Sequence, residues 1–320
     1  MGRRALITGG AGFIGSHVAD AFLGAGYDVT VLDNLSSGKR AQVPRGAALH
    51  ELDIRAPEAA ALVRDGGFDV VCHLAAQIDV RRSVADPGAD AAVNIVGSLN
   101  LLEAVRASGR RTRFIFSSTG GAVYGDLVSP PTAETEPKDP QSPYGAAKLS
   151  VEYYMGYYAR VHGMDTVALR YANVYGPRQD PHGEAGVVAI FCDRIIDGVP
   201  LTVFGDGKQT RDYVFAGDVA RANLLAAGAA LPPAAGVDSR AFNIGTSVET
   251  DVVQLAATLG AVSGASPQIT HAPARAGEQR RSAVAVGRAA AVLGWRPTVS
   301  LADGLRLTYE WFVDRRAEAR

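Results

Sequence analysis

The feature that most constrains the fold of this chain is a glycine-rich turn close to its N-terminus. Three glycines, spaced three positions apart, separate the apolar run 4–8 from a helical pattern at 13–25. The first glycine permits a tight turn, the second lets a pyrophosphate approach the backbone, and the third lets the helix pack closely on the strand. The free N–H groups at the start of such a helix point at the phosphates. The turn therefore predicts a dinucleotide site that includes Gly9, Gly12, Phe13, Ile14 and Gly15.

An acidic residue, Asp33, ends the next apolar run, about 20 residues after the turn. Its carboxylate can accept hydrogen bonds from the hydroxyls of an adenine ribose, whereas its charge repels a 2′-phosphate. NAD is therefore favoured over NADP as the cofactor, although Lys39 and Arg40 lie nearby and weaken this preference. The alternative is a strand–helix–strand unit that binds no ligand.

Strand-like and helix-like segments alternate through the first half of the chain. The strands are apolar on both faces, which indicates a parallel sheet covered by helices on both sides. Right-handed crossovers leave the doubly wound sheet as the leading topology. The expected strands are 4–8, 28–32, 48–52, 68–74, 113–117 and 166–171, and the expected helices are 13–25, 57–65, 87–108 and 142–162.

The pattern loosens after residue 171, where Gly, Pro and Asp become frequent. We therefore predict an α/β fold: a doubly wound parallel (Rossmann) sheet with a smaller C-terminal α/β lobe that binds the substrate. The expected NAD-binding domain comprises residues 1–171 plus about 212–245, and the lobe comprises about 172–211 plus 246–320. Short strands are expected at 202–204, 213–215 and 242–244, and helices at 218–229, 252–259, 287–293 and 301–314.

The composition excludes several classes of function. The 320 residues carry a net charge of −1, so no global basic field attracts nucleic acid or anionic lipid. No run approaches the ~20 apolar residues of a membrane span. Two cysteines cannot form a disulfide framework, and they favour a reducing, cytoplasmic setting. His50 and His182 have no partners at the spacing of metal ligands, so we expect no metal site.

A tyrosine and a lysine at i, i+4, Tyr144 and Lys148, share one face of an expected helix. A free tyrosine has a pKa of about 10, which makes it a poor base at neutral pH. An ammonium about 4 Å away lowers this pKa by about three units when the effective dielectric is near 20. This spacing is common by chance, but Thr119 stands at the carboxyl end of an expected strand, where ligands bind in open α/β sheets. The three side chains are therefore candidates for a base, its modulator and a hydrogen-bond donor to a substrate oxygen.

Several other residues are candidates for contact with the cofactor. Asp53 follows the third expected strand, and it either hydrogen-bonds the adenine edge or caps the next helix. The alanines after the fourth strand let the chain pass close to the cofactor, although plain packing explains them as well. Asn94 is a buried amide on the following helix. The candidate set is Asp33, Asn34, Asp53, Ile54, Leu74, Ala75, Ala76, Asn94, Ser117, Tyr144, Lys148 and Tyr171.

Further motifs make the chain resemble an extended short-chain dehydrogenase/reductase, and within that group the UDP-galactose 4-epimerase family. The likeness runs from about residue 4 to about residue 310. Motifs so numerous and in this order are specific for the superfamily, and less specific for the substrate. The matching segments are TGGAGFIGSH (8–17), DNLSSG (33–38), HLAA (73–76), FSSTGGAVYG (116–125), SPYGAAK (142–148), LRYANVYGPRQ (169–179), VFGDGKQTRDYVF (203–215) and FNIGT (242–246).

The resemblance implies NAD-dependent 4-epimerisation of a nucleotide sugar, with UDP-glucose and UDP-galactose as the expected pair. Tyr144 would take the proton of the sugar 4-hydroxyl, and NAD⁺ would accept the C4 hydride and return it to the other face of a 4-keto sugar. Lys148 would hold the nicotinamide ribose, and Thr119, or alternatively Ser118, would bind the 4-oxygen. The implied contacts with the UDP-sugar are Thr119, Tyr144, Asn173, Val188, Phe204, Arg211, Arg275 and Glu278.

The resemblance also defines the rival functions. Related dehydratases place an acidic pair where this chain has Gly120 and Gly121, so 4,6-dehydration lacks its proton shuttle. Ser282 falls near a position that is bulky in many relatives, and a small residue there would admit N-acetylated sugars. The alternatives are a 4-epimerase of UDP-glucuronate, of a UDP-N-acetylhexosamine or of another NDP-sugar, a 4-keto-sugar reductase, and a non-catalytic NAD-sensing protein. A homodimer through helices 87–108 and 142–162 is a further expectation.

Overall fold

A seven-stranded parallel sheet forms the centre of the protein. The computed structural model describes residues 2–126, 128–182, 186–274 and 279–318. The strands are β1 (Arg4–Thr8), β2 (Asp28–Asp33), β3 (Ala48–Glu51), β4 (Val70–His73), β5 (Arg113–Thr119), β6 (Asp165–Tyr171) and β11 (Ala241–Ile244). Their order across the sheet is β11-β6-β5-β4-β1-β2-β3. The later strands follow each other to one side of β1, and β2 and β3 lie on its other side, so the chain changes the direction in which it adds strands between β1 and β4. The predicted doubly wound sheet is therefore confirmed.

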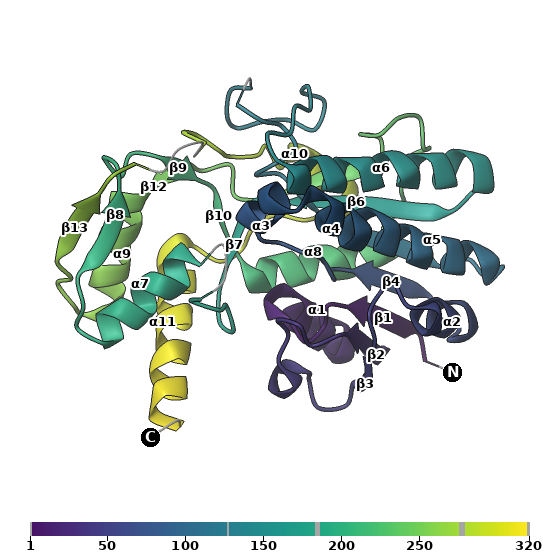
Figure 1. The fold of residues 1–320 in the computed structure, drawn as a ribbon, viewed down its shortest axis with the longest axis horizontal. Helices are drawn as coiled ribbons and strands as arrows, with labels where there is room; N and C mark the ends of the chain where they lie inside the picture. The colour runs from purple at the N-terminus through teal and green to yellow at the C-terminus, as the bar shows by residue number, and fades with distance from the viewer. Residues whose placement is uncertain (1, 127, 183–185, 275–278, 319–320) are drawn as a thin grey trace.

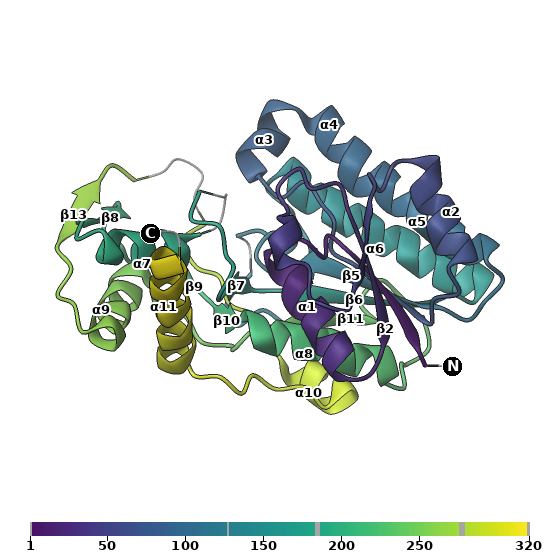
Figure 2. The same cartoon turned by 90° about the horizontal axis from the view of Figure 1, so that it is seen from below.

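Helices cover both faces of this sheet (Figure 2). Neighbouring residues of a strand face opposite sides, so Leu6 packs under one layer of helices and Ile7 under the other. Both layers are apolar, which explains why the strands carry few polar residues. One layer comprises α1 (Phe13–Gly24), α8 (Ala216–Gly228) and α10 (Gly287–Leu293), and the other comprises α2 (Pro57–Asp65), α3 (Val80–Ala85), α4 (Pro87–Ala91), the π-helical turn η2 (Ala92–Val96), α5 (Gly97–Ala107) and α6 (Pro143–His162).

A second, smaller lobe lies at the opposite end of the molecule from the N-terminus (Figure 1). Its core contains Val203, Leu255, Leu259 and Phe312, all buried. Its elements are α7 (Val187–Ile196), α9 (Val252–Ser263), α11 (Leu301–Glu318) and the strand pairs β8 (Leu201–Phe204) with β13 (Ile269–Ala272) and β9 (Thr210–Arg211) with β12 (Thr250–Asp251). The parallel pair β7 (Asn173–Tyr175) and β10 (Tyr213–Phe215) lies between the lobe and the sheet, and the short 3₁₀ helix η1 (Arg40–Gln42) follows β2.

Three details differ from the sequence expectations. The expected helix at 87–108 contains the π-helical turn η2, a feature that often accompanies functional sites. Helix α7 occupies part of the stretch in which the sequence pattern loosens, because its apolar residues are buried among α9 and α11. Helix α10 packs on α8 and β11, although the expected division placed residues 246–320 in the lobe. In the described part of the chain, no helix combines the length and apolarity that crossing a membrane requires.

Candidate active site

The candidate site lies at the carboxyl edge of the sheet. Thr8, Asp33, His73, Thr119 and Tyr171 are the last residues of β1, β2, β4, β5 and β6, respectively. Because these strands are parallel, their last residues share one edge, and this is the edge at which doubly wound sheets bind ligands. Among the described residues, no cluster of three or more His, Cys, Asp or Glu side chains is arranged to hold a metal ion.

The glycine turn after β1 fits closely against the loop after β4. Gly9 has a φ of 70°, and a Cβ there would lie 2.7 Å from the backbone nitrogen of Ala75. A Cβ on Gly15 would lie 2.1 Å from the carbonyl oxygen of Gly9. The Thr8 hydroxyl accepts hydrogen bonds from the backbone N–H groups of Leu74 and Ala75, both at 3.2 Å. The turn and the predicted alanine segment therefore form one continuous wall.

Helix α1 presents unpaired backbone donors at this wall. Its N-cap, Gly12, has no side chain that can accept a hydrogen bond from the helix. The N–H groups of Phe13 and Ile14 donate to no atom among the described residues. A twelve-residue helix with free N–H groups and no side chain in front of them suits a pyrophosphate. The residues present therefore fit the phosphates of NAD.

Asp33, which is predicted to bind the ribose, lies at the end of β2, and its carboxylate oxygens can accept further hydrogen bonds. Its Oδ2 accepts a hydrogen bond from Ala11 N at 3.0 Å, and its Oδ1 accepts one from Leu35 N at 2.9 Å. An ionised carboxylate has about four lone-pair positions, so each oxygen can accept a further hydroxyl. Asn34 donates to Asp53 at 3.1 Å, which brings two more candidates of this set together.

Asp53 does not cap the helix that follows it, which corrects one of the two sequence alternatives. The N-cap of α2 is Ala56, whereas Asp53 accepts two hydrogen bonds from the Arg55 guanidinium, both at 2.8 Å. These bonds hold the pKa of the Asp53 carboxyl below its usual range. Its neighbour Ile54 is buried in the core between the sheet and α2.

Asn94 supports the loop after β4 with both of its amide protons, and its predicted contact with the cofactor stays a prediction. It is buried in the π-helical turn, where its Oδ1 accepts from Gln77 N and its Nδ2 donates to Gln77 O, both at 2.9 Å. The same Nδ2 donates to Asp90 at 2.9 Å. Both amide protons are used, so Asn94 fixes the course of the loop after β4.

The structure places Tyr144 and Lys148 at the start of α6, next to the end of β5. Ser142 caps this helix by accepting a hydrogen bond from Gly145 N at 3.1 Å. Lys148 is buried, and its ammonium donates to the carbonyl oxygen of Ser117 at 2.8 Å. Its Nζ lies 5.8 Å from the centre of the Tyr144 ring. Tyr144 is half-buried, and its hydroxyl makes no hydrogen bond among the described residues, so it is available to a ligand.

The prediction that Lys148 lowers the pKa of Tyr144 is wrong, because other influences prevail. Burial raises the pKa of the Tyr144 phenol above its usual value, and the charge of Asp90 raises it further. Burial also lowers the pKa of Lys148 to about 8, against the opposing charges of Asp90 and Glu152. The expectation from the spacing left out the burial of the phenol and the nearby carboxylate of Asp90, which both raise the pKa of Tyr144.

Thr119 faces an open space that it shares with Asn173. A Cβ on Gly121 would lie 3.9 Å from both Thr119 Oγ1 and Asn173 Oδ1, so these polar atoms border the same volume. A Cβ on Gly120, in contrast, would lie 2.8 Å from a methyl group of Val284. The two positions that carry an acidic pair in dehydratases are therefore unequal: a side chain at Gly120 would displace Val284, whereas a Cβ at Gly121 would make ordinary contacts.

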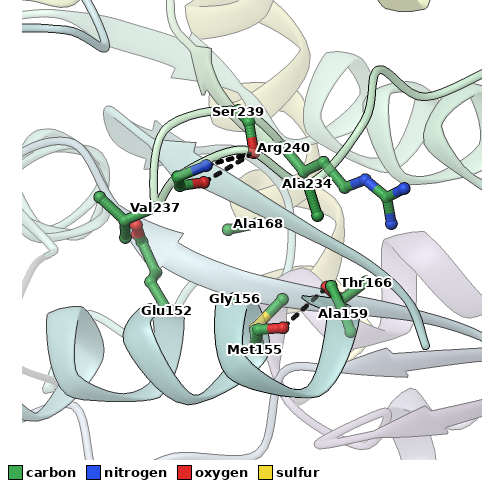
Figure 3. Close-up of a pocket in the computed structure, with 11 residues that line it drawn as sticks. Glu152, Met155, Gly156, Ala159, Thr166, Ala168, Ala234, Val237, Ser239 and Arg240 are labelled. Carbon is green, nitrogen blue, oxygen red and sulfur yellow. Dashed lines mark hydrogen bonds between the residues drawn. The ribbon is translucent and has the colours of Figure 1, made fainter. Parts of the chain in front are cut away.

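Ser118 points away from this space, which corrects its prediction as an alternative to Thr119. It is buried on the other face of β5, and its hydroxyl donates to Glu152 at 2.5 Å. Glu152 pairs with the fully buried Arg170 at 2.6 Å, and Arg170 pairs with Asp238 at 2.8 Å. Glu152 rises from α6 toward the loop that carries Val237 (Figure 3). We call Ser118, Glu152, Arg170 and Asp238 the Arg170 cluster.

Two further candidates, Val188 and Tyr171, have buried side chains that already contact other residues of the protein. Val188, a predicted contact of the UDP-sugar, has its side chain buried in the core of the second lobe, so the predicted contact would have to come from its backbone. The Tyr171 hydroxyl accepts a hydrogen bond from Asn223 at 2.7 Å and also interacts with Ser117. The Tyr171 side chain therefore stabilises the end of β6, and the Val188 side chain stabilises the core of the second lobe.

The substrate side of the site is assembled from distant segments. Arg211 donates to the carbonyl oxygens of Thr210 and Gln279, both at 2.8 Å, and Phe204 lies half-buried on β8. Gln279 donates in turn to Gly125 O at 2.9 Å, which links the lobe to the loop after β5. The predicted contacts Arg275 and Glu278 lie outside the described residues.

Sequence reasoning missed two buried acids beside the site. Asp212 accepts hydrogen bonds from the backbone nitrogens of Thr246 at 2.7 Å and Ser247 at 3.1 Å, and it thereby fixes the loops next to Arg211. Asp90 contacts Asn94 and acts on Tyr144. The available signal for Asp90 was its position four residues before Asn94, on the same helical face.

Comparisons with known proteins agree with this geometry. The model of the NAD dependent epimerase/dehydratase family matches residues 5–245. The UDP-glucose 4-epimerase of Mycolicibacterium smegmatis is 44% identical over 317 residues, which cover 98% of this chain and 99% of the relative. A structure of UDP-glucose 4-epimerase from Thermotoga maritima with UDP-glucose superposes with a TM-score of 0.92 at 48% identity, over 98% of this chain and 99% of that one. A Thermus thermophilus UDP-glucose 4-epimerase in complex with NAD gives 0.89 at 42% identity, over 97% and 99%. The chain therefore belongs to the NAD dependent epimerase/dehydratase family.

Proposed function

We propose that the protein is a 4-epimerase that interconverts UDP-glucose and UDP-galactose through a transient 4-keto sugar. The observation that carries the proposal is the convergence of Thr119, Tyr144 and Lys148 at the edge where α1 presents its free N–H groups. The relatives that share 44% and 48% of the sequence over nearly the whole chain carry the same name, UDP-glucose 4-epimerase.

In this proposal the residues of the chain position the sugar and move one proton. Tyr144 removes the proton of the 4-hydroxyl, Thr119 hydrogen-bonds the 4-oxygen as charge develops on it, and Lys148 holds the nicotinamide ribose from its anchor on Ser117 O. NAD⁺, when bound, would supply the acceptor for the C4 hydride, the reduced form from which the hydride goes back to the other face of the turned 4-keto sugar, and, while oxidised, a positive charge that opposes the raised pKa of Tyr144. Tyr144 then returns the proton to the 4-oxygen.

The second lobe holds the nucleotide in the same proposal. Asn173 borders the sugar space, Phe204 lines the base, and Arg211 and Arg275 pair with the diphosphate, which suits their forked N–H donors. Glu278 bonds the uridine ribose. Residues 1–171 and 212–245 then bind NAD, whereas residues 172–211 and 246–320, except for α10 on the sheet, bind the UDP-sugar.

The direct test is turnover by the purified protein without added cofactor. The protein is incubated with UDP-glucose, and UDP-galactose is followed by NMR. Product formed without added NAD supports an epimerase that retains its cofactor. Conversion of only UDP-glucuronate or a UDP-N-acetylhexosamine reassigns the sugar, a requirement for stoichiometric NAD(P)H indicates a reductase, and bound NAD without turnover of any sugar indicates a sensor.

We also propose that the enzyme is a homodimer and works in the cytoplasm. Three exposed side chains of α6, Tyr153, Tyr157 and Val161, follow each other at intervals of four and form an apolar stripe. Val96 of the adjacent η2 is exposed as well, and such a surface suits a second helix pair. Light scattering that finds only monomer would contradict the dimer.

The proposed location in the cytoplasm suits the two buried free thiols, because a reducing compartment keeps cysteines from forming disulfides.

A further inference from the structure

A buried carboxylate, Asp90, lies beside the Tyr144–Lys148 pair without an ion-pair partner. Asp90 is 2% exposed, and its Oδ1 accepts hydrogen bonds from Gln77 Nε2 and Asn94 Nδ2, both at 2.9 Å. In the part of the chain that the structure describes, no cationic nitrogen lies within 4.0 Å of it. Two neutral amides compensate a buried carboxylate poorly. A buried acid that is kept at this cost points to a function.

The packing places the charge of Asp90 next to both members of the pair. Helix α4, which carries Asp90, packs on α6, and the π-helical turn packs there as well. After burial, Asp90 is the strongest influence on the pKa of Tyr144 and also on that of Lys148, and it raises both. The raised pKa of Tyr144 disfavours its phenolate form, and the raised pKa of Lys148 favours its ammonium form.

The other titratable groups that face Lys148 are few. Glu152, one turn later on α6, also raises the pKa of Lys148, but it is already paired with Arg170. His73, at the end of β4, is buried between the hydroxyls of Thr8 and Ser98, and burial lowers its pKa to about 3, so it is neutral at physiological pH. Asp90 is therefore the carboxylate near the pair whose charge is not neutralised by another residue.

We propose that Asp90 is a positioning residue whose carboxylate sets the charge state of the Tyr144–Lys148 pair and thereby the pH range of turnover. It keeps the ammonium charged at the pH where burial alone would neutralise it, and it keeps the phenol protonated until a positive charge enters the site. The kinetic part of this inference rests on the proposed epimerase function. Through Gln77 and Asn94, the same carboxylate also anchors the loop after β4, so the test must separate charge from structure.

The kinetic test is the pH profile of kcat/KM for Asp90→Asn, which removes the charge and keeps the shape. Both limbs are expected to move to lower pH by about one unit, because the pKa values of the phenol and the ammonium fall together. Asp86→Asn is the matched control: it removes the same charge from the exposed N-cap of α4, and Asn caps a helix as well as Asp does. Its profile is expected to match the native one. A uniform loss of rate in Asp90→Asn with unshifted limbs would show that Asp90 is only structural.

A second readout does not depend on turnover. The chain has four lysines, Lys39, Lys138, Lys148 and Lys208, so NMR of protein labelled at lysine Cε gives few signals, and Lys148→Met assigns one of them. Lys148 is expected to titrate near pH 8 in the native protein and at lower pH in Asp90→Asn.

The two readouts separate this proposal from the proposed function. A shifted Lys148 titration in a protein without epimerase activity would support the role of Asp90 and refute the epimerase. An unchanged Lys148 titration in Asp90→Asn would overturn the role of Asp90, whatever the activity. Asp90→Ser, which also removes the charge, replaces the Asn variant if that variant does not fold.

Discussion

Helix α6 contributes to two groups of ionisable side chains, the Arg170 cluster through Glu152 and the Tyr144–Lys148 pair, and these groups differ in how completely they are paired. In the Arg170 cluster, Glu152 and Arg170 form an ion pair at 2.6 Å, and Asp238 and the Ser118 hydroxyl complete their hydrogen bonds. Two turns earlier, the Tyr144 hydroxyl has no partner among the described residues, and one turn earlier Lys148 has a single carbonyl acceptor.

The difference indicates which buried polar groups can still bind a ligand. A buried polar group that is fully paired adds rigidity and has nothing left to offer a ligand. A buried group whose hydrogen bonds are not all made lowers the stability of the protein, and a ligand that makes the missing hydrogen bonds restores that stability. We therefore expect substitutions in the Arg170 cluster to change stability and substitutions at the Tyr144–Lys148 pair to change turnover.

The largest effect on turnover is expected for Tyr144→Phe. Removing the hydroxyl removes the proposed base, so kcat should fall by about 10³- to 10⁴-fold. Binding of NAD and thermal stability should change little, because the hydroxyl makes no hydrogen bond within the described protein. The check is steady-state turnover together with the NAD content of the purified variant. Turnover within tenfold of the native rate would remove Tyr144 from its role.

The largest effect on stability is expected for Arg170→Met. This substitution leaves Glu152 charged, buried and unpaired, and it should lower the free energy of unfolding by about 3–5 kcal/mol. The double variant Glu152→Gln/Arg170→Met removes both charges and should recover part of the loss. Urea denaturation of the three proteins forms the test. Equal stabilities for the single variant and the native protein would show that the pair is dispensable.

These expectations also indicate how much of the molecule can be predicted from its sequence. The glycine turn, Asp33 and the Tyr144–Lys148 spacing are local patterns, and short-range geometry suffices to place them on one sheet edge. The alternating strands and helices gave the doubly wound sheet for the same reason, since periodicity reports burial directly.

The remaining features depend on contacts between distant segments. Adjacent strand residues face opposite sides, so only one of Ser118 and Thr119 can face the sugar space. Which one does so depends on Glu152 and Arg170, which follow Ser118 by 34 and 52 positions. The effect of Asp90 likewise requires α4 to pack on α6. The raised pKa of Tyr144 follows from that packing and could not be obtained from spacing alone.

A paired substitution on β5 sharpens the comparison further. Thr119→Val removes the proposed hydrogen bond to the 4-oxygen and should lower kcat by about 10²-fold with unchanged stability. Ser118→Ala removes the donor to Glu152 and should lower the free energy of unfolding by about 1–3 kcal/mol with nearly unchanged kcat. Both quantities are measured on both variants. The opposite assignment of effects would transfer the role proposed for Thr119 to Ser118.

The smallest expected effect is a gradient of stability with pH. The folded pKa of Lys148 is about 8, whereas its ordinary value is 10.5. Between these two values the unfolded chain binds a proton that the folded protein does not, so stability rises with pH across this window. The contribution of Lys148 is at most about 1.4 kcal/mol per pH unit. Denaturation of native protein, Lys148→Met and the exposed control Lys39→Met at pH 8, 9 and 10 isolates it. The gradient should vanish only in Lys148→Met, and an equal gradient in that variant and in the native protein would show that another group causes it and that the pKa of Lys148 is not lowered.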